Sequence, residues 1–462
     1  MAEASTVNIT RLIDERPLGA MQIRVVVLCG FVALLDGLDL QAIGLAAPAI
    51  ARALQVEPHA FGAVFGAALL GLMLGAFTLG PLADRIGRKR VLVASTCIFG
   101  FFTICTALAG SFTALLVIRF LTGLGLGGAM PSFISLGSEY APRRIRSLLV
   151  TLLWAGFPLG GVIGGVLASF LIPAFGWQSV FYIGGIVPIL LAAVLAAALP
   201  ESLGFLVAND APPETIRRIV SRISPESGAG AAQRFVRGEE RLPGVPVRHL
   251  FGGGRAAGTL LLWVPYFTAF MMLVTNSSWS PIVLGQAGLG VSQSGLIMAM
   301  YNGGSVVGTL IVGWLINISG PYRVLTIALA LSALAFGAVG FAAPSLNAVM
   351  ALEGLGGLFL GAGSSGLIAL AAVFYPISIR SSGVGWANGI GRFGSFCGPL
   401  IAASLVRGHW NIENLYLALG APGLVAALFV MLLGLHQTMR ARRGASEEPS
   451  GVLAPDDRAA RP

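Results

Sequence analysis

The chain alternates long apolar segments with short polar ones over most of its length. Each apolar run holds about 20 residues or more, which is the length of helix that crosses the hydrocarbon core of a bilayer. Charged residues, prolines and glycine-rich turns separate the runs, so the pattern predicts an all-α polytopic membrane protein with twelve transmembrane helices. The predicted spans are residues 24–50, 60–83, 91–109, 112–138, 147–171, 178–199, 257–284, 293–317, 323–343, 346–374, 381–406 and 413–436.

The longest polar interruption divides these spans into two sets of six. Residues 200–256 follow the sixth span, and we expect them to form a linker. An N-terminal six-helix half (24–199) precedes the linker, and a C-terminal six-helix half (257–436) follows it. A short N-terminal segment (1–23) and a polar C-terminal tail (437–462) complete the predicted organisation.

Composition and charge support a membrane protein and orient it. Of the 462 residues, 56% are hydrophobic and 11% are charged, whereas soluble domains carry about 25% charged residues. Nearly all of the 29 lysine and arginine residues lie in the loops after the even-numbered spans or in the two termini; Arg52 and Arg407 lie on the opposite side. The positive-inside rule therefore places the linker and both termini in the cytoplasm, in a cell membrane that we expect to be a bacterial inner membrane.

The two halves contain a repeat. The segment "GAFTLGPLADRIGRKR" (75–90) aligns with "GTLIVGWLINISGPYR" (308–323), and "YAPRRIRS" (140–147) aligns with "FYPISIRS" (374–381) at almost the same spacing. Two copies of a six-helix unit joined by a linker are typical of a transporter whose binding site lies between the halves.

Two carboxylates interrupt the first apolar span, in "DGLDLQ". Asp36 and Asp39 are three residues apart, so they share one helix face, about 18 Å from the start of the span at 1.5 Å per residue. An ionised group in the hydrocarbon costs at least ~3 kcal/mol, so both are expected to face a cavity. A carboxyl group that gains and loses a proton there can couple proton uptake to substrate uptake. The alternative is that one aspartate is a structural group, hydrogen-bonded to a neighbouring helix.

Arg392 lies near the middle of the eleventh span. Its guanidinium group stays charged and presents a planar fork of donors that matches a carboxylate. We interpret it as a ligand of a substrate carboxylate; the alternative is a permanent pair with one of the aspartates. Side chains at a similar depth could stack on a planar ring or donate hydrogen bonds, although most such aromatic residues serve packing. These candidates are Trp154, Trp279, Tyr301 and Trp386, with Asn276, Asn302 and Asn388 as polar groups.

Arg119 and Glu353 occupy equivalent positions in the repeat, in the fourth and tenth spans. A two-fold relation between the halves places them at one depth, where opposite charges could close the periplasmic side by pairing. An equally supported alternative is that Arg119 binds the substrate or an aspartate of the first span, while Glu353 faces periplasmic water.

The loop between the second and third spans, "GPLADRIGRKR", combines glycines that permit close helix packing with a cluster of charges. It is expected either to latch the cytoplasmic side or only to fix the topology. The residues concerned are Gly80, Asp84, Arg85, Gly87, Arg88 and Arg90. Asn317 replaces the aspartate in the second copy, so a latch in that half must be weaker or uncharged.

Glu139 ends the fourth span in "SEYAPRRIR", close to Arg143. It is either a solvated carboxylate that balances the neighbouring arginines or a part of a gate.

Several segments together carry a resemblance to a known family. The loop "GPLADRIGRKR" resembles the loop 2–3 signature of the major facilitator superfamily, and the likeness extends over all twelve spans. "DGLDLQAIGLAAPAI" (36–50) resembles the first helix of the aromatic acid:proton symporters. "RFLTGLGLGGAMP" (119–131), "LPESLGFLV" (199–207) and "GVGWANGIGRFGSFCGPL" (383–400) are similar to further segments of that family. The resemblance implies the major facilitator fold and proton-coupled import of an aromatic carboxylic acid, of the benzoate, hydroxybenzoate or phenylpropionate class, by alternating access.

Other functions fit the sequence less well. An enzyme is not expected, since the chain offers no nucleophile with a base, no metal-ligand cluster and no phosphate loop. A transporter of another small organic anion and a drug/proton antiporter are the alternatives, but neither an antiporter nor a sugar porter obviously needs Arg392. We expect protons as the coupling ion, no metal or other cofactor, no nucleic-acid partner, and a monomer in the lipid bilayer.

Overall fold

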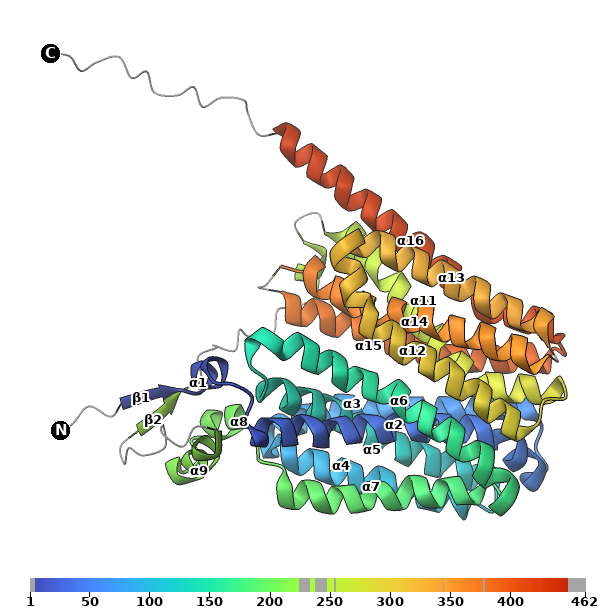
Figure 1. The fold of residues 1–462 in the computed structure, drawn as a ribbon, viewed down its shortest axis with the longest axis horizontal. Coiled ribbons are helices and arrows are strands. Elements are labelled where there is room, and N and C mark those ends of the chain that lie inside the picture. The colour runs from blue at the N-terminus through green and yellow to red at the C-terminus, as the bar shows by residue number, and fades with distance from the viewer. Residues whose placement is uncertain are drawn as a thin grey trace.

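The computed structural model describes residues 5–223, 233–236, 247–252, 255–343, 345–376 and 379–447. Long helices form most of it, and they run alongside one another in a single bundle (Figure 1). The first six are α2 (Ala20–Leu54), α3 (Phe61–Ile86), α4 (Arg88–Ala107), α5 (Phe112–Glu139), α6 (Arg143–Phe175) and α7 (Gln178–Ala198). The other six are α11 (Ala256–Gln286), α12 (Val291–Ser319), α13 (Pro321–Ala342), α14 (Leu346–Phe374), α15 (Arg380–Arg407) and α16 (Ile412–Glu447).

These helices confirm the predicted polytopic membrane fold. In the described part of the chain, eleven helices are long and apolar enough to cross a membrane, or twelve if α1 (Ile9–Glu15) and α2, which meet at 98°, count as one span. Each predicted span coincides with one of the long helices, with ends that differ by a few residues except at the C-terminal end of α16.

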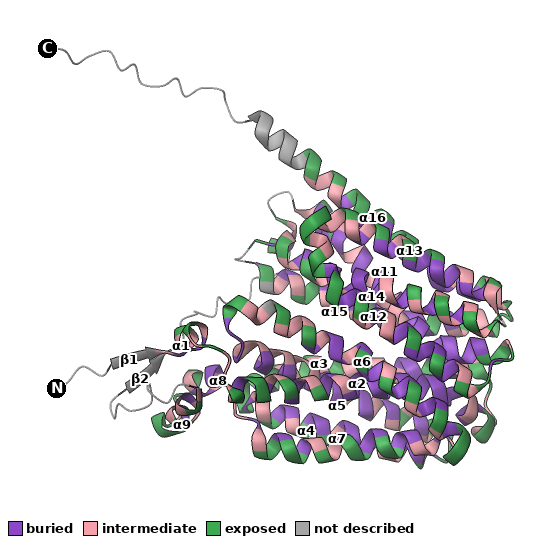
Figure 2. Ribbon diagram, viewed as in Figure 1, coloured by how far each residue is buried: buried purple, intermediate pink, exposed green. Residues whose placement is uncertain are grey.

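The surface of the bundle is suited to lipid. Figure 2 shows exposed residues along the outer faces of the helices and buried ones inside the bundle. Many of the exposed side chains are large and apolar, including Phe77, Phe170 and Trp314, which are 70%, 69% and 65% exposed. Soluble monomers rarely expose contiguous apolar patches of this kind, so these faces are positioned to contact the acyl chains of a bilayer.

Shorter elements gather at the end of the bundle predicted to be cytoplasmic (Figure 1). Strands β1 (Ser5–Asn8) and β2 (Gln233–Val236) pair in parallel, with Ser5 opposite Gln233. The remaining short elements are η1 (Pro58–Ala60) at the opposite end and, in the linker, α8 (Leu203–Ala208), α9 (Pro213–Ile223) and α10 (Arg248–Phe251). The linker, expected only as a polar stretch, therefore carries secondary structure, and β2 ties it to the N-terminal segment.

The last long helix continues beyond residue 437, where the predicted C-terminal tail begins. Helix α16 continues to Glu447, because the residues after Leu435 include good helix formers such as Gln, Met, Arg and Ala and contain no proline before that point. Residues 448–462, and the linker residues 224–232, 237–246 and 253–254, lie outside the described residues.

The repeat in the sequence corresponds to a repeated packing arrangement. In the first set, α3 packs on α5, α2 on α6, and α4 on α7; in the second set, α12 packs on α14, α11 on α15, and α13 on α16. The two sets meet mainly through α6 with α12, α2 with α11, and α3 with α15.

The helices of the two sets approach closely near the end predicted to be periplasmic. A Cβ atom added to Gly44 of α2 would lie 2.7 Å from the carbonyl oxygen of Ser277 of α11. Likewise, a Cβ on Gly165 of α6 would lie 2.7 Å from the carbonyl oxygen of Gly295 of α12. Such separations are possible only without side chains, so the glycines bring the two halves into contact and close this end.

The glycine between the two aspartates of "DGLD" is required by helix packing. A Cβ atom on Gly37 would lie 1.8 Å from the carbonyl oxygen of Phe157 of α6. We expect Gly37→Ala to push α2 away from α6 and to lower the thermal unfolding temperature of the purified protein by several degrees, since overpacking typically costs ~1–3 kcal/mol. Gly313→Ala is the matched control, because nothing lies within 4 Å of a Cβ at that exposed helical position. Equal unfolding temperatures for the two variants would contradict this account.

Candidate functional site

A cavity of about 550 Å³ lies between the two halves of the bundle. Helices α2, α3, α5 and α6 line it from one half, and α11, α12, α14 and α15 line it from the other. Its walls are mostly apolar, with aromatic side chains from both halves. The charged groups in the lining are Asp36, Asp39, Arg119 and Arg392. A pocket of this size and composition suits a small organic molecule.

The cavity extends toward the end predicted to be cytoplasmic. Its lining includes Ile134 near the end of α5 and Gly385 near the start of α15. The glycine contacts at Gly44 and Gly165 close the opposite end. With the predicted orientation in the membrane, this arrangement is inward-facing.

Asp39 and Arg119 form a buried pair of charges. Arg119 Nη1 donates to Asp39 Oδ1 at 3.0 Å, and Nη2 donates to Oδ2 at 2.7 Å. Thr103 Oγ1 adds a third hydrogen bond to Oδ1 at 3.1 Å. Both charged residues are only 1% exposed. Both carboxylate oxygens thus accept from a guanidinium group, which can only donate, and this two-pronged geometry is typical of strong charge-assisted pairs.

The predicted pairing of Arg119 with Glu353 is wrong. Of the alternative, the part that pairs Arg119 with an aspartate of the first span is confirmed, and the part in which Glu353 faces water is wrong. Glu353 is completely buried, and its carboxylate accepts hydrogen bonds from Asn276 at 2.9 Å and Ser280 at 2.7 Å, both on α11. Arg119 turns toward α2, the first helix of its own half, and Glu353 turns toward α11, the first helix of the other half. Equivalent positions in the repeat therefore direct both side chains into their own halves and not across the cavity.

Asp36 and Arg392 face the cavity from opposite halves. Asp36, on α2, is 7% exposed, and Arg392, on α15, is partly exposed. Their charges interact electrostatically, but among the described residues no salt bridge joins them, and Arg392 Nη2 instead contacts the thioether sulfur of Met130. A thioether is a weak acceptor, so the guanidinium keeps its capacity to bind a carboxylate.

Four of the other predicted substrate ligands line the cavity. They are Tyr301, Asn388, Trp154 and Asn302.

Trp386 and Asn276 do not line the cavity, which corrects their predicted place in the substrate site. Trp386 is 45% exposed and stacks on Trp263 with ring centroids 6.1 Å apart, because its position on α15 turns it toward the outside. Asn276 points away from the cavity to Glu353. Trp279, a further candidate, is buried and donates to the Pro399 carbonyl oxygen at 3.1 Å.

Hydroxyl groups in the lining were not predicted from the sequence. They come from α11, α12, α14 and α15, and they are Ser277, Ser278, Ser305, Thr309, Ser364, Ser365 and Ser395. The spacing of Asn302, Ser305 and Thr309 is a signal that could have indicated the two hydroxyl groups on α12, because residues three, four and seven apart share one helix face.

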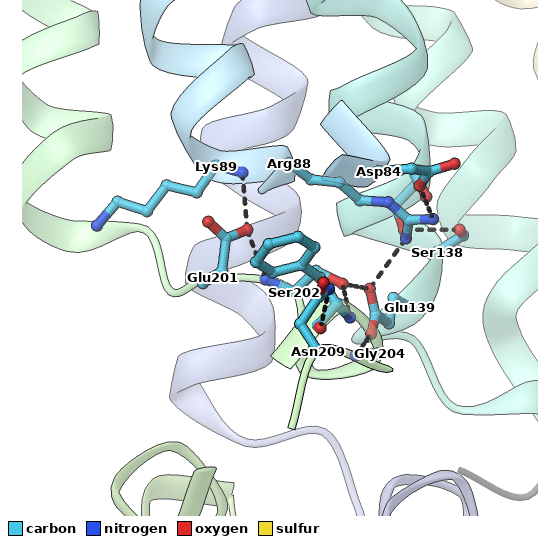
Figure 3. A network of polar contacts seen from close by, with 11 residues as sticks. Asp84, Arg88, Lys89, Ser138, Glu139, Glu201, Ser202, Gly204 and Asn209 are labelled. Atoms are coloured by element: carbon cyan, nitrogen blue, oxygen red, sulfur yellow. Dashed lines mark hydrogen bonds and ion pairs between the residues drawn. The ribbon is translucent and has the colours of Figure 1, made fainter. Parts of the chain in front are cut away.

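The loop between α3 and α4 anchors a polar network at the cytoplasmic end (Figure 3). Arg88 donates to Glu139 Oε2 at 3.2 Å and to Asp84 Oδ1 at 3.3 Å. Glu139 also accepts from the Ser202 hydroxyl at 2.6 Å and from the amide of Gly204. Arg88 thus forms an ion pair with Asp84, and through Glu139 it connects α4 to α5 and to the N-terminus of α8.

Glu201 holds the start of α4 in the same network. Its Oε1 accepts from the amides of Lys89 and Ser202, both at 2.9 Å, and the negative charge there favourably meets the positive end of the helix dipole. Gly87 has φ = +111°, and a Cβ on it would lie 2.4 Å from Glu201 Oε2, so this position of the motif requires glycine.

The remaining residues of the predicted loop motif have local contacts. Arg143 forms an ion pair with Asp14 of α1 at 3.2 Å, and Arg90 contacts the Ile86 carbonyl oxygen at 3.5 Å. Arg85 is exposed, and a Cβ on Gly80 would lie 3.8 Å from Pro131. The network described here stays within the first half and α8, so in this inward-facing structure it does not bridge the two halves.

Metal ligands are a separate question. Within the part of the chain that the structure describes, no group of three or more His, Cys, Asp or Glu side chains could hold a metal ion.

Comparisons with known proteins identify relatives over nearly the whole chain. The family described as the Major Facilitator Superfamily matches residues 29–293 and 262–458. The chain is 38% identical over 429 residues to the 4-hydroxybenzoate transporter PcaK of Pseudomonas aeruginosa, covering 93% of this chain and 96% of that protein. It is 37% identical over 413 residues to the 3-(3-hydroxy-phenyl)propionate transporter of Escherichia coli, covering 88% and 92%. Among solved structures, a D-xylose-proton symporter has the same fold, with a TM-score of 0.69 at 19% identity over 88% of this chain and 97% of that one.

Proposed function

Because this chain belongs to the Major Facilitator Superfamily, we propose that it imports an aromatic carboxylic acid together with protons, by alternating access of the cavity to the two sides of the membrane. The chain is a transporter and not an enzyme. The observation that carries the proposal is Arg392, a guanidinium group in a largely apolar cavity with no salt-bridge partner among the described residues. The proposed substrates belong to the benzoate, hydroxybenzoate or phenylpropionate class.

Arg392 would bind the substrate carboxylate. A guanidinium offers two parallel N–H donors that match the two oxygens of a carboxylate, and such charge-assisted pairs are stronger than neutral hydrogen bonds. The Met130 sulfur that it contacts in this structure is a poor competitor for these donors. Names of relatives support this assignment, because the 4-hydroxybenzoate and 3-(3-hydroxy-phenyl)propionate transporters both act on aromatic carboxylates.

The ring of the substrate would lie against the apolar walls. Trp154 and Phe157 of α6, Phe270 of α11 and Tyr301 of α12 line the cavity. Aromatic side chains bury large areas and contact one another favourably in stacked or edge-to-face arrangements. The walls therefore offer flat apolar surface on both sides of the bundle.

Asp36 would carry the coupling proton. With Asp36 and Asp39 ionised, the two carboxylates balance the two guanidinium groups of the empty cavity. A bound monoanion would leave one uncompensated negative charge in a site of low dielectric constant, which is costly. A proton on Asp36 restores neutrality, while Asp39 stays paired with Arg119. Charge balance thus favours one proton for each monoanion.

The chain supplies both halves of the site, so we propose that it works as a monomer. We place it in the inner membrane with both termini in the cytoplasm, since the linker elements and the arginine-rich loops lie at the end to which the cavity opens. No bound cofactor is needed for this mechanism, in which the proton gradient supplies the free energy.

Uptake by cells that express the chain tests this function. We expect labelled 4-hydroxybenzoate, benzoate or 3-phenylpropionate to accumulate at least about tenfold over cells with an empty vector, corresponding to ~1.4 kcal/mol of drive, and a protonophore to abolish the accumulation. Cells that express the impaired Arg392→Ala variant serve as a second control. If no aromatic acid accumulates in a protonophore-sensitive manner, the proposal is wrong. Protonophore-sensitive accumulation of non-aromatic organic anions, or efflux of a lipophilic cation, would support the alternative functions instead.

A further inference from the structure

Glu353 is a buried acid that the proposed mechanism does not use. It lies on α14 within the membrane-spanning bundle, is 0% exposed, and is not among the residues that line the cavity. A carboxyl group at this depth is costly to keep and is usually functional.

Uncharged partners surround the Glu353 carboxyl group. Asn276 Nδ2 donates to Oε2 at 2.9 Å, Ser280 Oγ donates to Oε1 at 2.7 Å, and Tyr416 Oη lies 3.4 Å from Oε1. The hydroxyls of Ser280 and Tyr416 are also hydrogen-bonded to each other. The titratable groups near it are the tyrosines Tyr416 of α16 and Tyr301 of α12. Among the described residues of α11, α13 and α15, which also pack on α14, no charged side chain interacts with it.

This cluster can be satisfied with or without a proton on Glu353. Hydroxyl and amide groups both donate and accept hydrogen bonds. In addition, the Asn276 Oδ1 atom is buried without a hydrogen-bond partner, so rotation of this amide would supply an acceptor for a protonated carboxyl group. Asp39 differs, because its partner Arg119 can only donate. Burial without a cation favours the neutral acid at Glu353 in the present conformation.

The cluster lies directly behind the periplasmic contact between the halves. Asn276 and Ser280 are four residues apart and share the face of α11 that is turned to Glu353. The intervening Ser277 and Ser278 contact Gly44 of α2 and line the cavity. Opening the periplasmic end must separate α11 from α2. This movement exposes α11, which carries the hydrogen-bond partners of the Glu353 carboxyl group, to water.

We propose that Glu353 is a proton-binding site that controls the periplasmic gate formed by α2 and α11. The gate closes over the neutral carboxylic acid, and in the open state the carboxyl group can release its proton to periplasmic water and become ionised. Since the closed state excludes water, it binds this proton more strongly, and by reciprocity external acid favours closure. This inference rests on the proposed alternating access, but it does not depend on the nature of the substrate.

Thiol labelling from the periplasmic side tests the proposal. Ser278 is buried and lines the cavity, so Ser278→Cys reports opening when the four native cysteines have been replaced by serine. Right-side-out membrane vesicles without a proton gradient are treated with a membrane-impermeant maleimide between pH 5.5 and 8.5. Labelling is divided by that of Gly110→Cys, an exposed loop position with nothing within 4 Å of its Cβ, which corrects for the reactivity of the thiol itself.

We expect the corrected labelling to rise at least threefold with pH when Glu353 is present, and to be low and independent of pH with Glu353→Gln. An Asp36→Asn variant should keep the rise, which separates Glu353 from the acid in the cavity. The same rise with and without Glu353→Gln would overturn the proposal.

A second variant guards against misfolding of Glu353→Gln. The double substitution Ser280→Ala with Tyr416→Phe keeps the carboxyl group but removes its hydroxyl partners, so the midpoint of the labelling profile should move by half a pH unit or more. An unchanged midpoint would also overturn the proposal. No aromatic acid is present in these measurements, so they test the gate even if the chain does not transport aromatic acids.

Discussion

Asp36→Asn is expected to abolish accumulation of the substrate against its gradient, lowering the accumulation ratio by at least about tenfold, while the substrate still exchanges across the membrane. Each loss of 1.4 kcal/mol in the free energy that drives uptake lowers the accumulation ratio tenfold. An asparagine cannot exchange a proton, so it removes the contribution of the proton gradient entirely. The amide resembles the protonated acid in charge and shape, so the substrate can still bind beside Arg392 and move with the cavity. Asp36 lies in the cavity without a salt bridge among the described residues, which makes it the acid that is free to exchange its proton.

The experiment compares uphill uptake with counterflow in proteoliposomes preloaded with unlabelled substrate. Asp39→Asn is the informative control. It leaves the Arg119 guanidinium buried without its carboxylate partner, and breaking a buried ion pair typically costs ~3–5 kcal/mol, so both uptake and counterflow should be lost, together with part of the protein in the membrane. Adding Arg119→Gln to Asp39→Asn should restore the amount of protein but not the uptake. Normal accumulation by Asp36→Asn would show that another group carries the proton.

Arg392→Lys is expected to impair transport nearly as much as Arg392→Ala, and both should raise the apparent substrate constant about 10- to 100-fold, which matches ~1.5–3 kcal/mol for a hydrogen bond to a charged group. A lysine keeps the positive charge beside Asp36 but does not reproduce the fork of two parallel donors. Initial rates over a range of substrate concentrations, corrected for protein abundance, provide the measurement.

Arg407→Lys is the matched control for this prediction. Arg407 ends the same helix, α15, at the end predicted to be periplasmic and is exposed, so the same change there should leave transport as in the wild type. A wild-type substrate constant in the Arg392→Lys variant would mean that Arg392 only compensates the charge of Asp36. The carboxylate of the substrate would then have to bind elsewhere in the cavity.

The sequence determined the helices and the charged residues of the cavity, and it predicted the orientation of the helices in the membrane. Span length and the bias of arginine toward one side are properties of short segments, so all twelve spans could be located within a few residues. Asp36, Asp39, Arg119 and Arg392 could be singled out because charges are costly in a bilayer, and the structure gathers them around one cavity. The repeat correctly indicated that Arg119 and Glu353 occupy matching helices.

Only the tertiary structure decided which of these groups meet. Arg119 pairs with Asp39, and Glu353 is held by Asn276 and Ser280, whereas the repeat suggested a pair across the cavity. The sequence likewise did not show that Trp386 turns outward or that Glu139 binds the start of α8. The direction of a side chain depends on the rotation and tilt of its helix against its neighbours. Contacts between segments far apart in the chain set that rotation and tilt, and the apolar pattern of a membrane helix, which is hydrophobic toward both lipid and core, does not encode them.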